Sequence, residues 1–156
     1  MRIRDKIKKP QRPVVAYEIL PPREKDGTLN AYAETISSLL SQTHIDAINI
    51  PEVHDEVGRG ERPVSNQERG EPRKFGMLLQ DIVGIEAIVN RVVVHMPLKK
   101  QMEWIQETYS QFEIDNLVIV GGESSKKKYP GPTVNESLEK ISQDNRLREN
   151  SILCGG

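Results

Sequence analysis

The sequence is poor in cysteine, with Cys154 as the single thiol in 156 residues. One thiol excludes an internal disulfide and any zinc site built from several cysteines, so a reducing, cytoplasmic location is the simplest expectation. The sequence also lacks any run of about 18 apolar residues, and no apolar stretch follows the basic N-terminus as in a secretory signal. We therefore expect neither a membrane-spanning nor a secreted protein.

An excess of charge of one sign is also missing, because 22 basic residues stand against 23 acidic ones. This balance gives no general attraction to nucleic acid or to an anionic membrane. Hydrophobic residues make up 36% and charged residues 29% of the sequence, which is polar for a globular protein but not typical of a disordered one. We expect one domain at residues 14–156, preceded by a basic N-terminal arm at 1–13.

Short β-branched runs alternate with segments whose apolar residues recur at helical spacing. This alternation predicts an α/β fold in which β/α units build a parallel sheet. The predicted strands are "VVAYEIL", "DAINI", "RVVVHM" and "NLVIVGG", with "SILCGG" as the start of a fifth. Helices are predicted at 29–40 with Thr28 as the N-cap, at about 73–83, at 98–112 and at 134–141. Four β/α units in a row are therefore expected.

Polar residues come late in several predicted strands and, by strand alternation, point away from their bulky neighbours. In parallel α/β folds, ligands bind where the carboxyl ends of the strands meet, at the top of a barrel or at the switch point of an open sheet. We expect one site there, formed by Glu18, Asn49, His95 and the turn Gly121, Gly122 and Glu123.

The segments "YEILPPRE", "INIPEV" and "IDNLVIVGGES", in this order, resemble the methylenetetrahydrofolate reductase family. In that family the first strand carries a motif of the type Phe-Glu-Phe-Phe-Pro-Pro-Lys, and the fourth ends in an Arg-Gly-Asp turn. The resemblance covers roughly residues 14–141. It implies a TIM-type (β/α)8 barrel, of which this sequence contains about half: four units and the start of a fifth strand.

The resemblance also implies a reaction. The family binds FAD at the carboxyl ends of the strands, takes electrons from NAD(P)H, and reduces 5,10-methylenetetrahydrofolate to 5-methyltetrahydrofolate. Glu18 matches the family's catalytic glutamate, a general acid toward the pterin. A partly desolvated carboxyl group suits that role because burial disfavours the charged form. Asn49, His95 and the turn at 121–123 would line the flavin and pterin site.

The sequence departs from the family in the fourth-strand turn and at Pro51, and the match to the third strand is open between two residues. The Arg-Gly-Asp turn becomes Gly121-Gly122-Glu123, and Pro51 stands where the family has a threonine, so a hydroxyl and an amide hydrogen are lost. Asn90 matches the family's third-strand histidine almost as well as His95 does. These departures concern flavin contacts, so a second hypothesis is a folate- or pterin-binding or assembly module of one-carbon metabolism without redox chemistry.

Half a barrel exposes a sheet edge on each side. We expect the chain to be a piece of a longer protein, to pair with a second copy, or to carry an added element that covers the edges. The expected ligand is a folate-type small molecule, and no metal is expected. His54, Asp55 and Glu56 are interpreted as a solvated loop because three adjacent residues cannot readily face one ion, and the lysines after Gly122 as a solvated loop as well.

Overall fold

The computed structural model describes residues 2–53, 69–122, 128–150 and 152–155. Its strands form one sheet in which each strand lies parallel to the next along the chain. Two predicted groups, Glu123 and the loop residues 54–56, lie outside the described residues. The five strands are β1 (Ala16–Glu18), β2 (Ala47–Pro51), β3 (Ala87–Val92), β4 (Asn116–Val120) and β5 (Ile152–Gly155).

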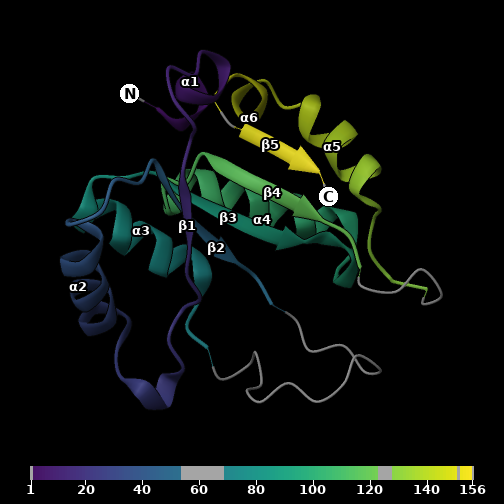
Figure 1. Ribbon diagram of the computed structural model, residues 1–156. Coiled ribbons are helices and arrows are strands. Elements are labelled where there is room, and N and C mark those ends of the chain that lie inside the picture. The colour runs from purple at the N-terminus through teal and green to yellow at the C-terminus, as the bar shows by residue number, and fades with distance from the viewer. Residues whose placement is uncertain (1, 54–68, 123–127, 151, 156) are drawn as a thin grey trace.

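Helices connect the successive strands, as the apolar spacing predicts (Figure 1). The four predicted helices are confirmed to within one or two residues, because apolar residues of each belong to the hydrophobic core. Two short helices, at 3–8 and 145–150, are additional to the prediction. The α-helices are α1 (Ile3–Lys8), α2 (Leu29–Leu40), α3 (Pro72–Val83), α4 (Leu98–Gln111), α5 (Val134–Ser142) and α6 (Asn145–Asn150).

Side chains cap the starts of α2, α3 and α5, whereas α4, which follows Pro97, has no side-chain cap. Thr28 accepts a hydrogen bond from the amide of Ala31 at the start of α2, as predicted. Thr133 and Glu136 form a reciprocal capping box at the start of α5. The Glu136 carboxylate accepts hydrogen bonds from the Thr133 amide and hydroxyl, and these bonds lower its pKa.

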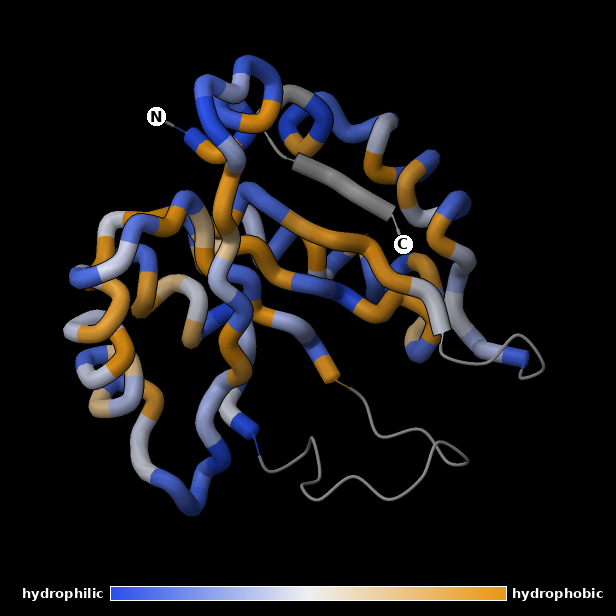
Figure 2. Tube along the Cα trace, in the orientation of Figure 1, coloured by the Kyte–Doolittle hydropathy of each residue, from blue (hydrophilic) through white to orange (hydrophobic). Residues whose placement is uncertain are grey.

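The hydrophobic core lies between the sheet and the helices that cover one of its faces. Helix α3 approaches β2 and β3 closely at Gly76, where an added Cβ would lie 3.0 to 3.3 Å from Ile114, Ile50 and Ala87. In Figure 2, β4 is mostly hydrophobic, whereas β3 changes midway to hydrophilic residues, which are Asn90 and Arg91 in the sequence. Strands in sequential, parallel order with helices on one face are the arrangement of about half a (β/α)8 barrel.

The opposite face of the sheet carries no helix in the described part of the chain, and we call it the open face. In β2, Ile48 and Ile50 are fully buried, while Asn49 between them is half-buried on the open face. This is the alternation that the sequence predicts. We call the margin of the sheet where the parallel strands end, at Glu18, Pro51 and Val92, the carboxyl edge.

The N-terminal segment packs against the opposite, amino-terminal margin of the sheet. Ile3 in α1 is buried, and the buried carboxylate of Asp46 accepts hydrogen bonds from Lys6 Nζ at 2.9 Å, from the Arg12 guanidinium at 2.7 and 2.9 Å, and from the Val15 amide at 2.9 Å. These donors, Arg12 foremost, hold the Asp46 pKa well below its usual range. The basic residues of the predicted arm therefore neutralise a carboxylate just before β2.

The third strand begins and ends earlier than predicted. The ladder runs over Ala87–Val92, and Val93–His95 form a 3-10 turn instead of strand. Val93 and Val94 are buried in this turn, as residues of a buried strand would be, so their apolar character could not distinguish strand from turn. His95 therefore lies beyond the end of β3, and Asn90 lies within it.

Candidate functional site at the carboxyl edge

Glu18 and Asn49 form the centre of the candidate site. They are paired across the first two strands, and Asn49 Nδ2 donates a hydrogen bond to Glu18 Oε2 at 3.0 Å. The ladder continues one residue further, with the Ile19 amide bonded to the Asn49 carbonyl at 2.9 Å, and then Pro21 and Pro22 end it. The sequence prediction that these two side chains converge fits this geometry.

Asn90 extends the same row of polar side chains onto β3. Asn49 and Pro51 are two residues apart in β2, so both lie on the open face. Pro51 is paired with Asn90 of β3, so Asn90 lies on that face as well. Its Oδ1 atom is buried and has no hydrogen-bond partner within the described residues. A buried acceptor in that state is costly. Glu18, Asn49 and Asn90 thus form a stepped polar row across three strands.

His95 is separated from this row by the end of β3. Its ring contacts the ring of Tyr129 edge-on, with 5.6 Å between the centroids. Tyr129 in turn lies against Gly122, where an added Cβ would approach its ring atoms to 2.2 Å. Gly122 is therefore needed for this close approach, and His95, Tyr129 and Gly122 form a second group at the ends of β3 and β4. Among the described residues, no hydrogen bond or ring contact joins this group to Glu18.

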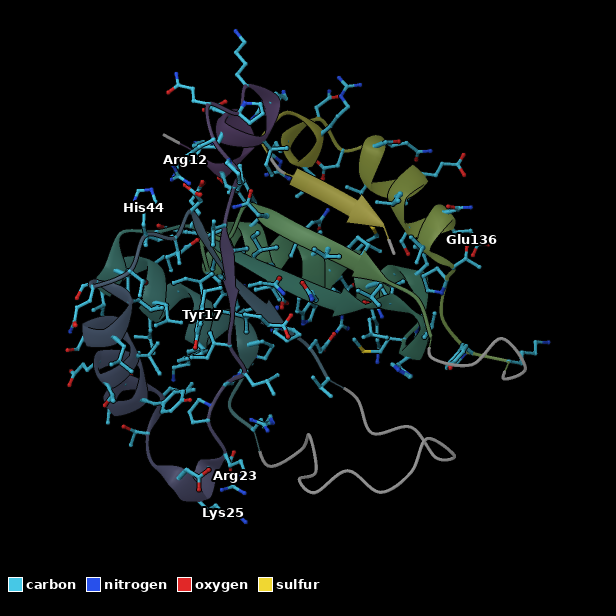
Figure 3. The ribbon with its side chains drawn as sticks, viewed as in Figure 1. Arg12, Tyr17, Arg23, Lys25, His44 and Glu136 are labelled. Carbon is cyan, nitrogen blue, oxygen red and sulfur yellow. The ribbon has the colours of Figure 1, made fainter. Side chains whose placement is uncertain are left out.

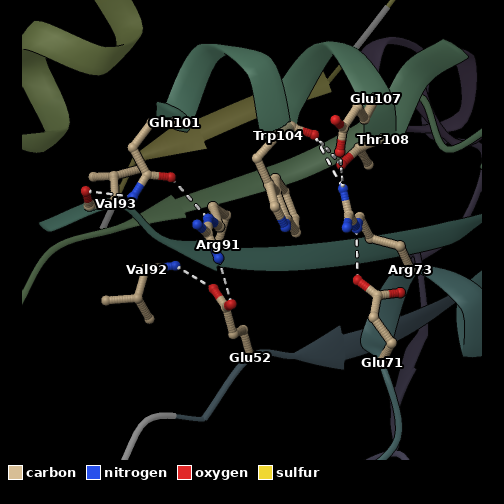
Figure 4. Close-up of polar contacts among 10 residues, drawn as sticks. All are labelled: Glu52, Glu71, Arg73, Arg91, Val92, Val93, Gln101, Trp104, Glu107 and Thr108. Carbon is tan, nitrogen blue, oxygen red and sulfur yellow. Dashed lines mark hydrogen bonds and ion pairs between the residues drawn. The ribbon is translucent and has the colours of Figure 1, made fainter. Parts of the chain in front are cut away.

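Glu52 joins the carboxyl ends of β2 and β3 (Figure 4). The Glu52 amide extends the ladder between the two strands by donating to the Asn90 carbonyl at 3.2 Å, and the Glu52 carboxylate accepts from the Val92 amide at 3.0 Å. The same carboxylate pairs with the guanidinium of Arg91. Glu52 thereby continues the ladder with a side chain and fixes the position of Asn90.

Arg91 points to the helix-covered face and is held from three sides. Its Nε donates to Gln101 Oε1 at 2.8 Å, and its guanidinium lies 4.3 Å from the ring of Trp104. The Arg73 guanidinium lies 4.5 Å from the same indole, so two cations flank one ring (Figure 4). Burial is the main cause that lowers the Arg91 pKa, and the Glu52 carboxylate opposes it. This arrangement is structural support for the row, not a contact surface for ligand.

The expected desolvation of Glu18 is not found in this chain. All three residues of β1 are exposed, because β1 is the edge strand and the open face is uncovered. Val15 and Tyr17, which by strand alternation lie on the other face, are 43% and 47% exposed, because β1 is an edge strand. A dry environment for Glu18 would require further protein or ligand on the open face.

The described residues fit only part of a flavin dinucleotide. The amides of Asn49 and Asn90 suit the polar edge of a flavin or pterin ring, but Pro51 offers only a carbonyl there. The Arg91 cation is engaged by Glu52 and Gln101, so Arg91 is not available to bind a pyrophosphate. The row therefore fits a pterin-type ring better than a whole FAD.

The described residues contain no cluster of three or more metal-ligating side chains. None of the described helices is long and apolar enough to cross a membrane. Both findings concern those ranges of the chain alone.

Two features were not predicted from the sequence. One is the contact of Glu52 with Arg91 and the Val92 amide, which we call the Glu52 clamp, and the other is the contact of Tyr129 with His95. One signal was available for the clamp. Arg91 is a charged residue inside an otherwise apolar strand, and such a residue needs a buried partner. The partner could not be identified, since Glu52 lies 39 residues earlier in the sequence.

The comparisons with known proteins support the fold alone. No family model and no curated protein matches the sequence. Among solved structures, the chain is similar to a Salmonella typhimurium protein provisionally assigned as an alpha amylase, with a TM-score of 0.50 and 13% identity. The match covers 91% of this chain and 31% of that one, so the chain spans under a third of that structure. The likeness is to the β/α architecture.

Proposed function

We propose that the carboxyl edge binds a reduced folate and that Glu18 acts there as a general acid, as in the methylenetetrahydrofolate reductase family that "YEILPPRE" resembles. The observation that carries this proposal is the position of Glu18 at the end of β1, hydrogen-bonded to Asn49 on the open face. Ligand sites of parallel α/β folds lie at this edge. The chain would contribute half of the complete site.

The chemistry follows from the row of side chains. A pterin edge carries both donors and acceptors, and the amides of Asn49 and Asn90 offer both kinds in return. Glu18, when protonated, would donate to N10 of 5,10-methylenetetrahydrofolate. The bond between N10 and the methylene carbon would then break, with its electron pair left on N10 and an iminium formed at N5. In the family the hydride comes from reduced FAD and ultimately from NAD(P)H, and that part rests on the resemblance.

A second candidate function is a binding or assembly module that holds a folate without reducing it. Pro51 favours this candidate, because it replaces a hydroxyl residue at a family flavin contact and has no amide hydrogen to offer. A purified protein that is yellow, with a flavin absorption band, would support the enzyme. A colourless protein that still binds a reduced folate would support the module.

The test is to compare Glu18→Gln with Glu24→Gln, an exposed carboxylate on the 3-10 turn that follows β1. We expect both variants to bind 5-methyltetrahydrofolate within about threefold of the wild type in calorimetry, since one neutral hydrogen bond contributes little net energy. In NAD(P)H-dependent reduction of methylenetetrahydrofolate, Glu18→Gln should lower the rate roughly 10²- to 10⁴-fold.

Two outcomes would contradict the proposal. One is an absence of folate binding by the wild-type chain. The other is an equal loss of reduction in Glu18→Gln and Glu24→Gln, which would show that the loss comes from charge in general.

A further inference from the structure

A cavity of about 430 Å³ opens beside Glu18, just beyond the end of β1. Its walls come from the Pro21-Pro22 turn, the 3-10 turn at Glu24–Asp26, the start of α2, and Arg69. This volume lies within the range of small-ligand sites, roughly 300–1,000 Å³. The cavity is therefore an extension of the Glu18 site and has room for part of a small molecule.

The charges in the cavity wall are unequally matched. Arg23 is neutralised within its own turn, because its guanidinium forms a two-bond ion pair with Asp26, and this bond lowers the Asp26 pKa. Figure 3 shows Arg23 at the tip of this turn, well below Tyr17 of β1. Arg69, in contrast, uses its Nη1 for the Pro21 carbonyl at 2.8 Å and forms no ion pair with any described residue, although its charge adds weakly to the lowering of the Asp26 pKa. A guanidinium has five N–H donors, so most of those of Arg69 stay available.

The backbone that carries Arg69 is held in place. Arg69 forms an isolated antiparallel bridge with Arg23, and the next amide, that of Gly70, donates to the Pro22 carbonyl at 2.9 Å. Gly70 also lies tightly against Leu29, where an added Cβ would approach the side chain to 2.4 Å. Arg69 is thus a fixed cation in the same cavity as Glu18.

We propose that Arg69 binds the anionic end, a carboxylate or a phosphate, of the molecule whose ring lies against Glu18 and Asn49. The inference rests on the proposed function for the ring, but its own basis is a guanidinium in the cavity wall that has one hydrogen bond and no ion pair among the described residues. Guanidinium groups bind both anions through paired hydrogen bonds. A reduced folate with its terminal carboxylates has this composition, with a polar ring at one end and an anion at the other.

The test measures anion binding separately from ring binding. The probes are p-aminobenzoylglutamate, which has the carboxylates without the pterin, inorganic phosphate, and a tetrahydropterin without an acidic tail. Arg69→Gln is compared with Lys25→Gln, an exposed cation of the neighbouring turn that does not line the cavity (Figure 3). Urea unfolding of both variants checks that each is folded.

We expect Arg69→Gln to weaken binding of p-aminobenzoylglutamate or phosphate by about tenfold or more, as the loss of a charged hydrogen bond predicts. Lys25→Gln should stay within about twofold, and binding of the tetrahydropterin should be unchanged in both. If p-aminobenzoylglutamate binds more tightly than phosphate, the anionic end of the ligand is a carboxylate, and if phosphate binds more tightly, it is a phosphate. The inference is overturned if the wild type binds neither anion, or if both variants lose equally.

Failure of this inference can be told from failure of the proposed function. Binding of an anion through Arg69 without any binding of the tetrahydropterin would support the anion site and contradict the folate proposal. Binding of the tetrahydropterin with no effect of Arg69→Gln on either anion would support the ring site of the proposed function and contradict the anion site at Arg69.

Discussion

At the scale of single residues, two carboxylates show how position decides what a charge does. Asp46 is buried and accepts hydrogen bonds from Lys6, Arg12 and the Val15 amide, so its negative charge is compensated within the fold. Glu18 is exposed and has one hydrogen bond, from Asn49. The first lies at the amino-terminal margin of the sheet, where stability resides in β/α barrels, and the second lies at the carboxyl edge, where ligands bind.

Asp46 gives a prediction on pH dependence. Its pKa is lower in the folded than in the unfolded protein, so the ionised group stabilises the fold above its unfolded pKa of about 3.9, and this contribution is lost as pH falls further toward the folded value. Asp46→Asn should therefore unfold at a clearly lower urea concentration than the wild type at pH 7, and the difference should shrink at pH 3.

The control for Asp46 is Asp81→Asn, which changes an exposed carboxylate on α3. Its unfolding midpoint should follow the wild type at both pH values. A difference between Asp46→Asn and the wild type that grew as the pH fell would contradict the assignment.

At the scale of elements, the junction of β2 and β3 is held by a side chain in addition to the backbone. The backbone ladder runs to the Glu52 amide, and the Glu52 carboxylate continues it by accepting the Val92 amide and pairing with Arg91. The Arg91 side chain is 4% exposed and that of Glu52 12%. Removing one partner of such a pair leaves the other charge buried and uncompensated.

We therefore expect Glu52→Ala to lower the free energy of unfolding by roughly 3–5 kcal/mol. The matched control is Glu107→Ala. Glu107 also pairs with an arginine, Arg73, but its side chain is 48% exposed, so its loss should cost less than about 1 kcal/mol. Urea unfolding monitored by circular dichroism measures both, and similar values for the two variants would show that the Glu52 clamp contributes no more than a surface pair.

The elements were the most predictable part of the molecule. Helix α2 was predicted with its cap and both ends, since apolar spacing and Thr28 act locally. The strand after Ala87 was shifted, because Val93 and Val94 are buried whether the backbone is strand or 3-10 turn. Within the site, strand alternation predicted that Glu18 and Asn49 lie close together, and the two side chains are hydrogen-bonded. The Glu52 to Arg91 pair joins residues 39 apart in the sequence, a partnership that no local pattern contains.

At the scale of the whole molecule, the arrangement is a half-barrel with one uncovered face. The helices cover one side of the sheet, and the row from Glu18 to Asn90 lies on the other, with β1 exposed at the edge. We propose that the remainder of a barrel, or a second copy of this chain, covers the open face in the working protein. Such a cover would exclude water around Glu18 and favour the protonated carboxyl that a general acid requires.

The central claim is that a reduced folate binds at the carboxyl edge. The most direct test is to add 5-methyltetrahydrofolate to the isotopically labelled chain and to map the amide chemical-shift changes. We predict that the largest changes lie at Glu18, Asn49 and Asn90, with the amides around Asp46 unchanged. Changes confined to the amino-terminal margin around Asp46, or no changes at saturating folate, would contradict the account.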